Sequence, residues 1–110
     1  MKVALHANPN KPAALELARR TLALLRDRAS VVLTEEVGAL DPSVPHAPWG
    51  SVEADVIVAV GGDGTFLHTL RRTTAPLLPV NAGTLGVLAE VDGASPGELS
   101  AASLVRSSRK

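Results

Sequence analysis

The sequence predicts a single domain of the α/β class built on a parallel sheet, and two observations lead to this prediction. Short apolar segments alternate along the chain with segments of helical periodicity, an order that gives parallel strands joined by right-handed crossovers. The segment Val56–Val60 is apolar at every position and rich in valine, which suits a strand buried on both faces of a sheet. With 110 residues, of which 45% are hydrophobic, the chain is long enough for one packed core.

The first part of the chain predicts a strand, a helix and a second strand. Lys2–Ala7 is a short apolar strand that ends at Asn8-Pro9-Asn10, because proline and asparagine favour turns. Pro12 suits the first turn of a helix, and residues 13–28 follow as that helix. The apolar stripe of this helix consists of Leu15, Ala18, Leu22 and Leu25. Ser30–Thr34 is too short for a helix and is the second strand.

The second part of the chain repeats this alternation after an irregular stretch. Residues 35–51 are rich in proline and glycine and predict a surface loop with at most one helical turn. A third strand is expected at 52–60, a second helix at 65–74 and a short fourth strand at 76–80. The periodic pattern weakens after residue 90. Together these elements define a three-layer Rossmann-like domain with its ligand site at the carboxyl edge of the sheet.

Composition excludes several classes of function. Basic and acidic residues number 11 each, which gives no electrostatic basis for binding nucleic acid or an anionic membrane. No apolar segment approaches the roughly 20 residues that span a bilayer, and no signal-peptide pattern follows the start. The chain has no cysteine, so disulfides and thiolate metal sites are excluded. A cytoplasmic location is expected.

The strand at Val56–Val60 leads directly into a glycine turn that holds one carboxylate. The turn consists of Gly61, Gly62, Asp63, Gly64 and Thr65. Glycine lets a backbone adopt positive φ and approach a ligand closely, and unpaired N–H groups at the start of the next helix attract phosphate. Asp63 repels phosphate, so it is expected to accept a proton from an attacking hydroxyl or to hold a metal ion. This pattern favours phosphoryl transfer over an ordinary glycine-rich connection.

A second glycine turn, residues 81–86, follows the last predicted strand. It contains Asn81, Gly83 and Gly86. Because the carboxyl ends of parallel strands meet at one edge of a sheet, both glycine turns and Asn8 are expected at the same edge. The first turn is not a Walker A loop, since no lysine follows its last glycine, and it does not match the dinucleotide-binding fingerprint.

These two turns resemble those of a known family. Residues 61–67, Gly-Gly-Asp-Gly-Thr-Phe-Leu, resemble the signature turn of NAD kinases, which diacylglycerol-type lipid kinases and 6-phosphofructokinases share. Residues 81–90 resemble the NAD kinase segment Asn-x-Gly-x-Leu-Gly-Phe-Leu-x-Glu, whereas the lipid kinases have a Gly-Thr-Gly-Asn-Asp sequence nearby. Val87 departs from the usual aromatic residue, so no stacking role is assigned to it. The resemblance covers roughly residues 1–91, the expected amino-terminal α/β domain of NAD kinase type.

The resemblance implies transfer of a phosphoryl group from ATP or inorganic polyphosphate to the adenosine-ribose 2′-hydroxyl of NAD, giving NADP. Asp63 takes the position of the family's catalytic proton acceptor. The residues implied in nucleotide or substrate binding are Asp63, Gly61, Gly62, Gly64, Thr65 and His68. Thr65 either caps the helix or contacts phosphate, and His68 either lies near the NAD phosphates or is an exposed helix residue. Asn81, Gly83 and Gly86 are expected to support the second turn.

The same resemblance implies a divalent cation, expected to be Mg²⁺, although no residue is assigned as its ligand. It also implies a homo-oligomer that binds NAD and a phosphoryl donor. NAD kinases carry a second, β-rich domain that this chain lacks, so residues 92–110 are expected to be a truncated or disordered tail. The isolated chain is therefore expected to be inactive. The alternatives are a non-catalytic nucleotide-binding remnant and a lipid kinase domain.

Several other residues receive no role in catalysis. His6 and His46 have no partner pattern and are expected to be non-functional. Trp49 is expected to be a hydrophobic plug or an interface anchor. Arg71-Arg72 is expected to be a solvated helix face.

Overall fold

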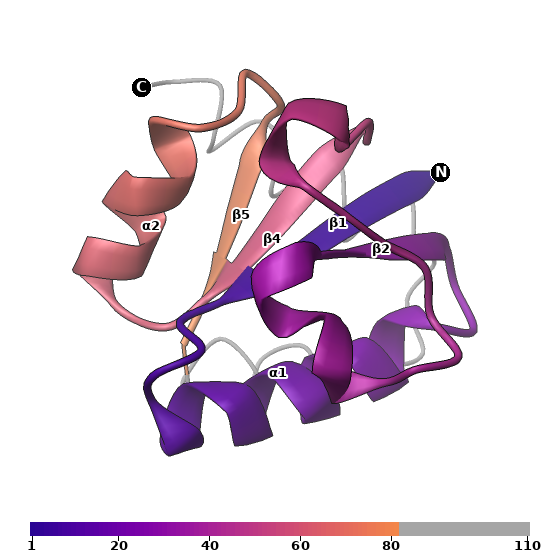
Figure 1. Cartoon of the computed structure of the whole chain (residues 1–110), viewed down its shortest axis with the longest axis horizontal. Coiled ribbons are helices and arrows are strands. Elements are labelled where there is room, and N and C mark those ends of the chain that lie inside the picture. The colour runs from indigo at the N-terminus through magenta and orange to yellow at the C-terminus, as the bar shows by residue number, and fades with distance from the viewer. Residues whose placement is uncertain (82–110) are drawn as a thin grey trace.

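The structure, a computed structural model, describes residues 1–81, which form a five-stranded parallel sheet with helices packed against it (Figure 1). Its elements are β1 (Lys2–Ala7), α1 (Pro12–Leu25), β2 (Ser30–Thr34), the 3₁₀ helix η1 (Glu35–Leu40), β3 (His46–Ala47), the 3₁₀ helix η2 (Trp49–Ser51), β4 (Val56–Val60), α2 (Asp63–Leu70) and β5 (Leu77–Val80). Within this described part, no helix is long and apolar enough to span a membrane.

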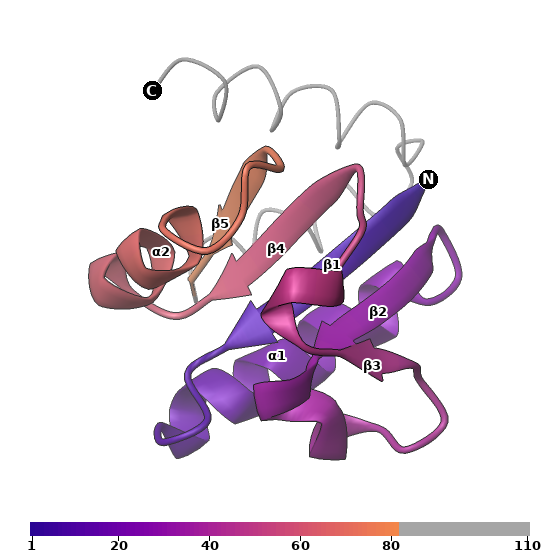
Figure 2. The ribbon, with the colours of Figure 1, turned by 45° about the horizontal axis from the view of Figure 1, so that its top comes forward.

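The strand order places β1 at the centre of the sheet. The order is β3-β2-β1-β4-β5, and every neighbouring pair is parallel (Figure 2). Leu5 of β1 lies opposite Leu33 of β2 on one side and Val58 of β4 on the other. The chain therefore adds strands on one side of β1 and then crosses to the other side. This reversal between β1 and β4 is the topological switch point, where sheets of this kind bind ligands.

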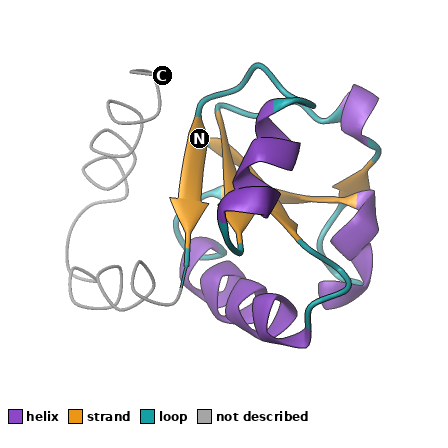
Figure 3. Cartoon of the chain, turned by 90° about the vertical axis from the view of Figure 1, so that its left-hand side faces the viewer, coloured by secondary structure: helices purple, strands orange, loops and turns teal. Residues whose placement is uncertain are grey.

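The two faces of the sheet are covered by different helices (Figure 3). Successive residues of a strand point to opposite faces. Val3 and Leu5 of β1 accordingly share a core with Leu22 of α1, whereas Ala4 of β1 shares a second core with Phe66 of α2. A helix on each face of a parallel sheet confirms the predicted three-layer α/β fold.

The stretch between β2 and β4 differs from its prediction. Residues 35–51 form η1, β3 and η2 instead of a surface loop, and Val37 and Val44 are buried in the core beneath α1. The Leu33 N–H donates to the Pro45 carbonyl at 2.8 Å, which holds this stretch against β2 and makes β3 an edge strand. The sequence did not reveal β3, because this strand has only two residues and is surrounded by proline and glycine.

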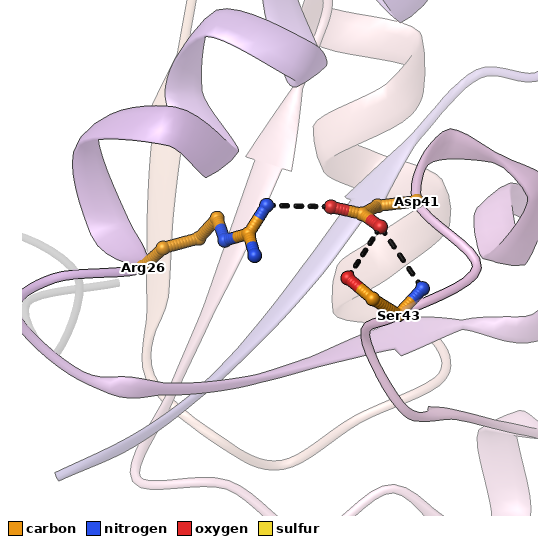
Figure 4. A network of polar contacts seen from close by, with 3 residues as sticks. All are labelled: Arg26, Asp41 and Ser43. Atoms are coloured by element: carbon orange, nitrogen blue, oxygen red, sulfur yellow. Dashed lines mark hydrogen bonds and ion pairs between the residues drawn. The ribbon is translucent and has the colours of Figure 1, made fainter.

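A polar contact ties this stretch to the end of α1 (Figure 4). Arg26 Nη1 donates to Asp41 Oδ2 at 2.7 Å, and Asp41 Oδ1 accepts from the N–H and the hydroxyl of Ser43 at 2.9 and 2.6 Å. These two hydrogen bonds from Ser43, with the Arg26 guanidinium beside them, hold the pKa of Asp41 below its usual value. The contact fixes the start of the turn that leads to β3.

The predicted bounds of several elements also shift. Helix α1 ends at Leu25 instead of residue 28, because the Arg28 N–H turns back to the Leu25 carbonyl at 2.9 Å. Strand β4 begins at Val56 instead of residue 52, and the Asp55 N–H makes its first bond to β1, to the Lys2 carbonyl at 2.8 Å. Helix α2 begins two residues earlier than predicted and ends at Leu70. Only the strands β1 and β2 have their predicted bounds at both ends.

Candidate active site

The candidate active site is a pocket of about 350 Å³ at the carboxyl ends of β1 and β4, the topological switch point of the sheet. Its lining combines residues 8–11 after β1, residues 62–65 at the start of α2 and three side chains from separate elements, His6, Glu36 and His68. The first two groups lie where the sequence placed them, at one edge of the sheet. The prediction that the turns after the first and third predicted strands converge is confirmed.

The turn after β4 requires glycine at Gly61. This residue has φ +152°, and a Cβ added to it would lie 2.7 Å from Thr65 Oγ1. Its N–H donates to the Val80 carbonyl at 2.9 Å, which ties the turn to β5. At Gly62 and Gly64, an added Cβ would meet nothing within 4 Å among the described residues. Both glycines belong to the pocket lining, so a ligand can approach the backbone there without meeting a side chain of the turn.

Helix α2 begins with a free first turn. Gly62 is its N-cap, the Phe66 N–H donates to the Gly62 carbonyl at 3.1 Å, and no side chain among residues 1–81 caps the helix. Thr65 is inside the helix, so the prediction that it caps the helix is wrong, while its place in the pocket lining keeps phosphate contact open. The N–H groups of this turn carry the positive end of the helix dipole and suit an anion.

Asp63 is the first residue of α2 and belongs to the pocket lining. Its side chain is exposed, and within residues 1–81 it has no hydrogen bond or ion pair. A residue that merely shaped the turn would bond its own backbone. The carboxylate is instead available to a ligand, which is what a proton acceptor in the pocket requires.

Two rings of the pocket wall, those of His6 and His68, belong to a cluster that also includes Trp49. His6 on β1 is 2% exposed, and its Nδ1 lies 2.8 Å from Thr34 Oγ1. The His6 ring stacks on the His68 ring with centroids 5.6 Å apart and planes at 17°, and the Trp49 ring lies 4.8 Å from His6. Trp49 Nε1 donates to Glu36 Oε1 at 2.7 Å. The cluster therefore joins β1, η1, η2 and α2.

Burial sets the protonation state of His6. It lowers the pKa of His6 to about 4, the negative Glu36 opposes this shift, and His68 and Arg72 add to it. The imidazole is therefore neutral at neutral pH. One ring nitrogen faces Thr34, which leaves the other available for a second partner.

The cluster corrects two predictions. His6 is not without partners, and His68 is half-buried against it instead of being an exposed helix residue. His6 had one sequence signal, since it is a titratable residue at the carboxyl end of a predicted strand. Glu36 had none, because the sequence predicted at most one helical turn within residues 35–51 and did not locate it. Trp49 packs against the second core as the plug prediction expected, and Arg71 and Arg72 are exposed.

The second glycine turn lies mostly outside the described residues. Asn81 directly follows β5 at the same edge as the pocket, and it is exposed. Gly83, Gly86 and the tail expected at 92–110 fall among residues 82–110, which are not described. Their predicted roles remain predictions.

Residues 1–81 form a parallel α/β domain with a glycine turn at its switch point, where, among these residues, the helix N-terminus has no cap and the Asp63 carboxylate no partner. This is the arrangement of a phosphate-binding domain of a phosphotransferase. The model of the ATP-NAD kinase N-terminal domain matches residues 49–104. The chain belongs to the NAD kinase family, as the sequence predicted.

Individual relatives agree with this assignment. The chain is 35% identical over 102 residues to the NAD kinase of Thermococcus sibiricus, covering 86% of this chain and 36% of the relative. It is 37% identical over 91 residues to the NAD kinase of Heliobacterium modesticaldum, covering 77% and 32%. The fold is similar to that of yeast NADH kinase solved with NADH, with a TM-score of 0.56 and 23% identity over 76% of this chain and 30% of that one. The chain thus spans about a third of the length of the relatives it matches.

Proposed function

We propose that this chain is the amino-terminal part of an NAD kinase, which phosphorylates the adenosine-ribose 2′-hydroxyl of NAD with ATP or inorganic polyphosphate. The observation that carries the proposal is the Asp63 carboxylate, which is unpaired within residues 1–81 and lies at the free N-terminus of α2. Family membership supports the reaction class, and the pocket at the switch point supports a phosphorylated ligand.

The residues of the pocket divide the chemistry between them. The Asp63 carboxylate accepts the proton of the 2′-hydroxyl while the oxygen forms a bond to the terminal phosphorus of the donor. The phosphoanhydride bond breaks, and its electrons leave with ADP or the shortened polyphosphate. The N–H groups of Gly64 and Thr65 bind the charge on the phosphoryl oxygens. The open space at Gly62 and Gly64 lets the phosphates approach the backbone.

The donor set also fits a hard divalent cation. Mg²⁺ takes one or two carboxylates and completes its shell with phosphate oxygens and water, and the exposed Asp63 carboxylate offers such a ligand. When bound with a nucleotide, Mg²⁺ would neutralise phosphate charge. This supports the expectation of a Mg²⁺-dependent reaction.

The test substitutes Asp63 in the longest protein that the gene encodes. Asp63→Asn keeps the shape of the side chain and removes its ability to accept a proton. The rate of NADP formation should fall by about 10²-fold or more, the usual contribution of a general base, while circular dichroism stays unchanged. Full activity in Asp63→Asn would remove the proposed role, and a lack of NADP formation by the unsubstituted protein would refute the function.

The 110-residue chain alone is expected to lack appreciable NAD kinase activity, since it spans about a third of its relatives. NADP formation is measured with the purified chain, and robust turnover would contradict this expectation. A chain that binds nucleotide without turnover would behave as the non-catalytic alternative. The NAD kinase match at residues 49–104 disfavours the lipid kinase alternative.

Family membership also supports a homo-oligomer in the cytoplasm. The balanced charge, with 11 basic and 11 acidic residues, supports the absence of a nucleic-acid partner. Analytical ultracentrifugation measures the oligomeric state, and a monomer at high protein concentration would contradict the proposed homo-oligomer.

A further inference from the structure

Three side chains to which the proposed reaction assigns no proton or phosphoryl transfer meet on the inner wall of the pocket. They are His6 of β1, Glu36 of η1 and His68 of α2, of which His68 is also implied in nucleotide binding by the family resemblance. One possible ligand atom of each lies within 4.8 Å of those of the other two. The residues are far apart in the sequence, so the fold has brought together two imidazoles and one carboxylate.

The ligand atoms of this cluster are held in place by partners behind them. When Nδ1–H of His6 donates to the Thr34 hydroxyl at 2.8 Å, Nε2 is left with a free lone pair. Thr34 itself is fully buried, so this partner is fixed. A hydrogen bond of this kind on the far nitrogen is what orients most metal-binding histidines.

The carboxylate and the second imidazole are also positioned. Glu36 Oε1 accepts the indole N–H of Trp49 at 2.7 Å, which leaves Oε2 for another ligand. The His68 ring is stacked on the His6 ring and is half-buried. Each of the three side chains thus has one contact that orients it and at least one atom left to bind.

We propose that His6, Glu36 and His68 bind a divalent transition-metal ion of the Zn²⁺ class. Imidazole nitrogen suits Zn²⁺, Co²⁺, Ni²⁺ and Cu²⁺, whereas Mg²⁺ prefers an all-oxygen shell. This distinguishes the site from a magnesium site at Asp63. Two histidines and one carboxylate also form a known zinc set that keeps a fourth position open.

Binding of an ion requires the three ligand atoms to move closer together. Bonds of about 2.0 Å in a tetrahedral shell put ligand atoms about 3.3 Å apart, against the limit of 4.8 Å here. His6 is buried, whereas Glu36 is exposed and His68 is half-buried, so the movement toward the ion would fall on Glu36 and His68. Arg72, whose guanidinium bonds the His68 carbonyl at 3.4 Å, is an opposing positive charge, but it is exposed and therefore well screened.

The open position of the ion belongs to the same pocket as Asp63 and the first turn of α2. A water molecule or a phosphate oxygen of a pocket ligand could occupy it. The proposal does not depend on kinase activity, because it concerns binding of the ion alone.

Zn²⁺ and Co²⁺ themselves are the probes, added to the full 110-residue chain. The chain has a single tryptophan, and Trp49 contacts both His6 and Glu36, so its fluorescence reports the site directly. We expect saturable binding of one ion with a change in Trp49 emission, and Co²⁺ absorption bands typical of nitrogen and oxygen ligands. A large excess of Mg²⁺ should not displace the ion.

Substitutions locate the ion. His68→Gln and Glu36→Gln should each weaken binding at least 10-fold, and circular dichroism checks that they fold. His46→Gln is the matched control, because His46 is the third histidine of the chain, is exposed and lies outside the cluster. Asp63→Asn should also retain Zn²⁺ binding, which separates this site from the proposed active-site base.

Three results would overturn the proposal. One is the lack of saturable Zn²⁺ binding by the unsubstituted chain. Another is an equal loss of Zn²⁺ affinity in His46→Gln and His68→Gln, which would indicate nonspecific binding of the ion to histidines. The third is a loss in Asp63→Asn with retention in His68→Gln, which would place the ion at the carboxylate.

Discussion

The two faces of the sheet are built from the same strands but have different contents. On the α1 face, β1 contributes Val3, Leu5 and Ala7 to an apolar core, and the buried Thr21 of α1 donates its hydroxyl to the Leu17 carbonyl of its own helix. On the α2 face, the alternate residues of β1 are Ala4 and His6, and the polar ring cluster lies at the carboxyl end of this face. The α1 face therefore stabilises the fold, and the α2 face carries polar chemistry at its end.

The difference between the two faces shows where a parallel α/β domain can accommodate a buried titratable group. An apolar core requires close packing, so a polar side chain within it costs free energy. His6 is buried at the end of its strand, where Thr34 on the neighbouring strand and His68 on α2 can reach it. Substitutions on the α1 face should change stability, whereas those in the cluster should change binding and pH dependence.

The largest stability effect is expected for Leu5→Ala on the α1 face. Leu5 is fully buried, and its truncation should lower the free energy of unfolding by about 2–5 kcal/mol, because it removes apolar contacts and leaves a cavity. Urea unfolding measures this change. Leu67→Ala is the control, since Leu67 is 50% exposed, and it should change stability by less than about 0.5 kcal/mol. Equal losses of unfolding free energy in Leu5→Ala and Leu67→Ala would contradict the role of the α1 face in stability.

The next effect is a loss of stability in acid through His6. Its pKa falls from 6.5 in the unfolded chain to about 4 in the fold, so as pH drops through this range the unfolded chain binds the proton first. Stability should therefore be complete above pH 6.5 and decrease toward pH 4, by as much as about 3 kcal/mol.

Urea unfolding between pH 7.5 and pH 4, about the range of the two pKa values, measures this loss in the unsubstituted chain and in His6→Gln. His6→Gln should lose most of the His6 component of the pH dependence, whereas His46→Gln should retain it. If the free energy of unfolding depends on pH equally in His6→Gln and in the unsubstituted chain, His6 is not the group responsible.

The sequence predicted the apolar scaffold better than the polar cluster, for a physical reason. Strands such as Lys2–Ala7 and Val56–Val60 and the glycine turn are local patterns, so periodicity and composition reveal them. The meeting of His6, Glu36 and Trp49 depends on η1 and η2, whose positions depend on contacts with distant strands. The sequence pattern does not predict these contacts, because neither residue spacing nor composition gives the distance in the fold between His6, Glu36 and Trp49.

A smaller effect on stability is expected for Gly61→Ala in the turn after β4. The residue has φ +152°, and the new Cβ would lie 2.7 Å from Thr65 Oγ1, so the substitution should cost about 1–3 kcal/mol. Gly62→Ala is the matched control, because its φ is −118° and its Cβ meets nothing. Its stability should be unchanged or slightly raised. Isothermal titration with ATP or polyphosphate should then show weaker binding for Gly62→Ala, and unchanged affinity would contradict an approach of phosphate at this glycine.

The smallest effect is expected for Trp49→Phe, which separates packing from hydrogen bonding in the cluster. Phenylalanine keeps an aromatic ring against His6 but removes the indole N–H that donates to Glu36 at 2.7 Å. Glu36 is exposed and water can replace the lost donor, so stability should fall by no more than about 1 kcal/mol. The free energy of Zn²⁺ binding should lose a larger fraction of its value than the free energy of unfolding, because Glu36 then loses the contact that orients it. Isothermal titration with Zn²⁺ measures this, and a large loss of stability with unchanged Zn²⁺ affinity would assign Trp49 to the core of the α2 face instead of to the metal cluster.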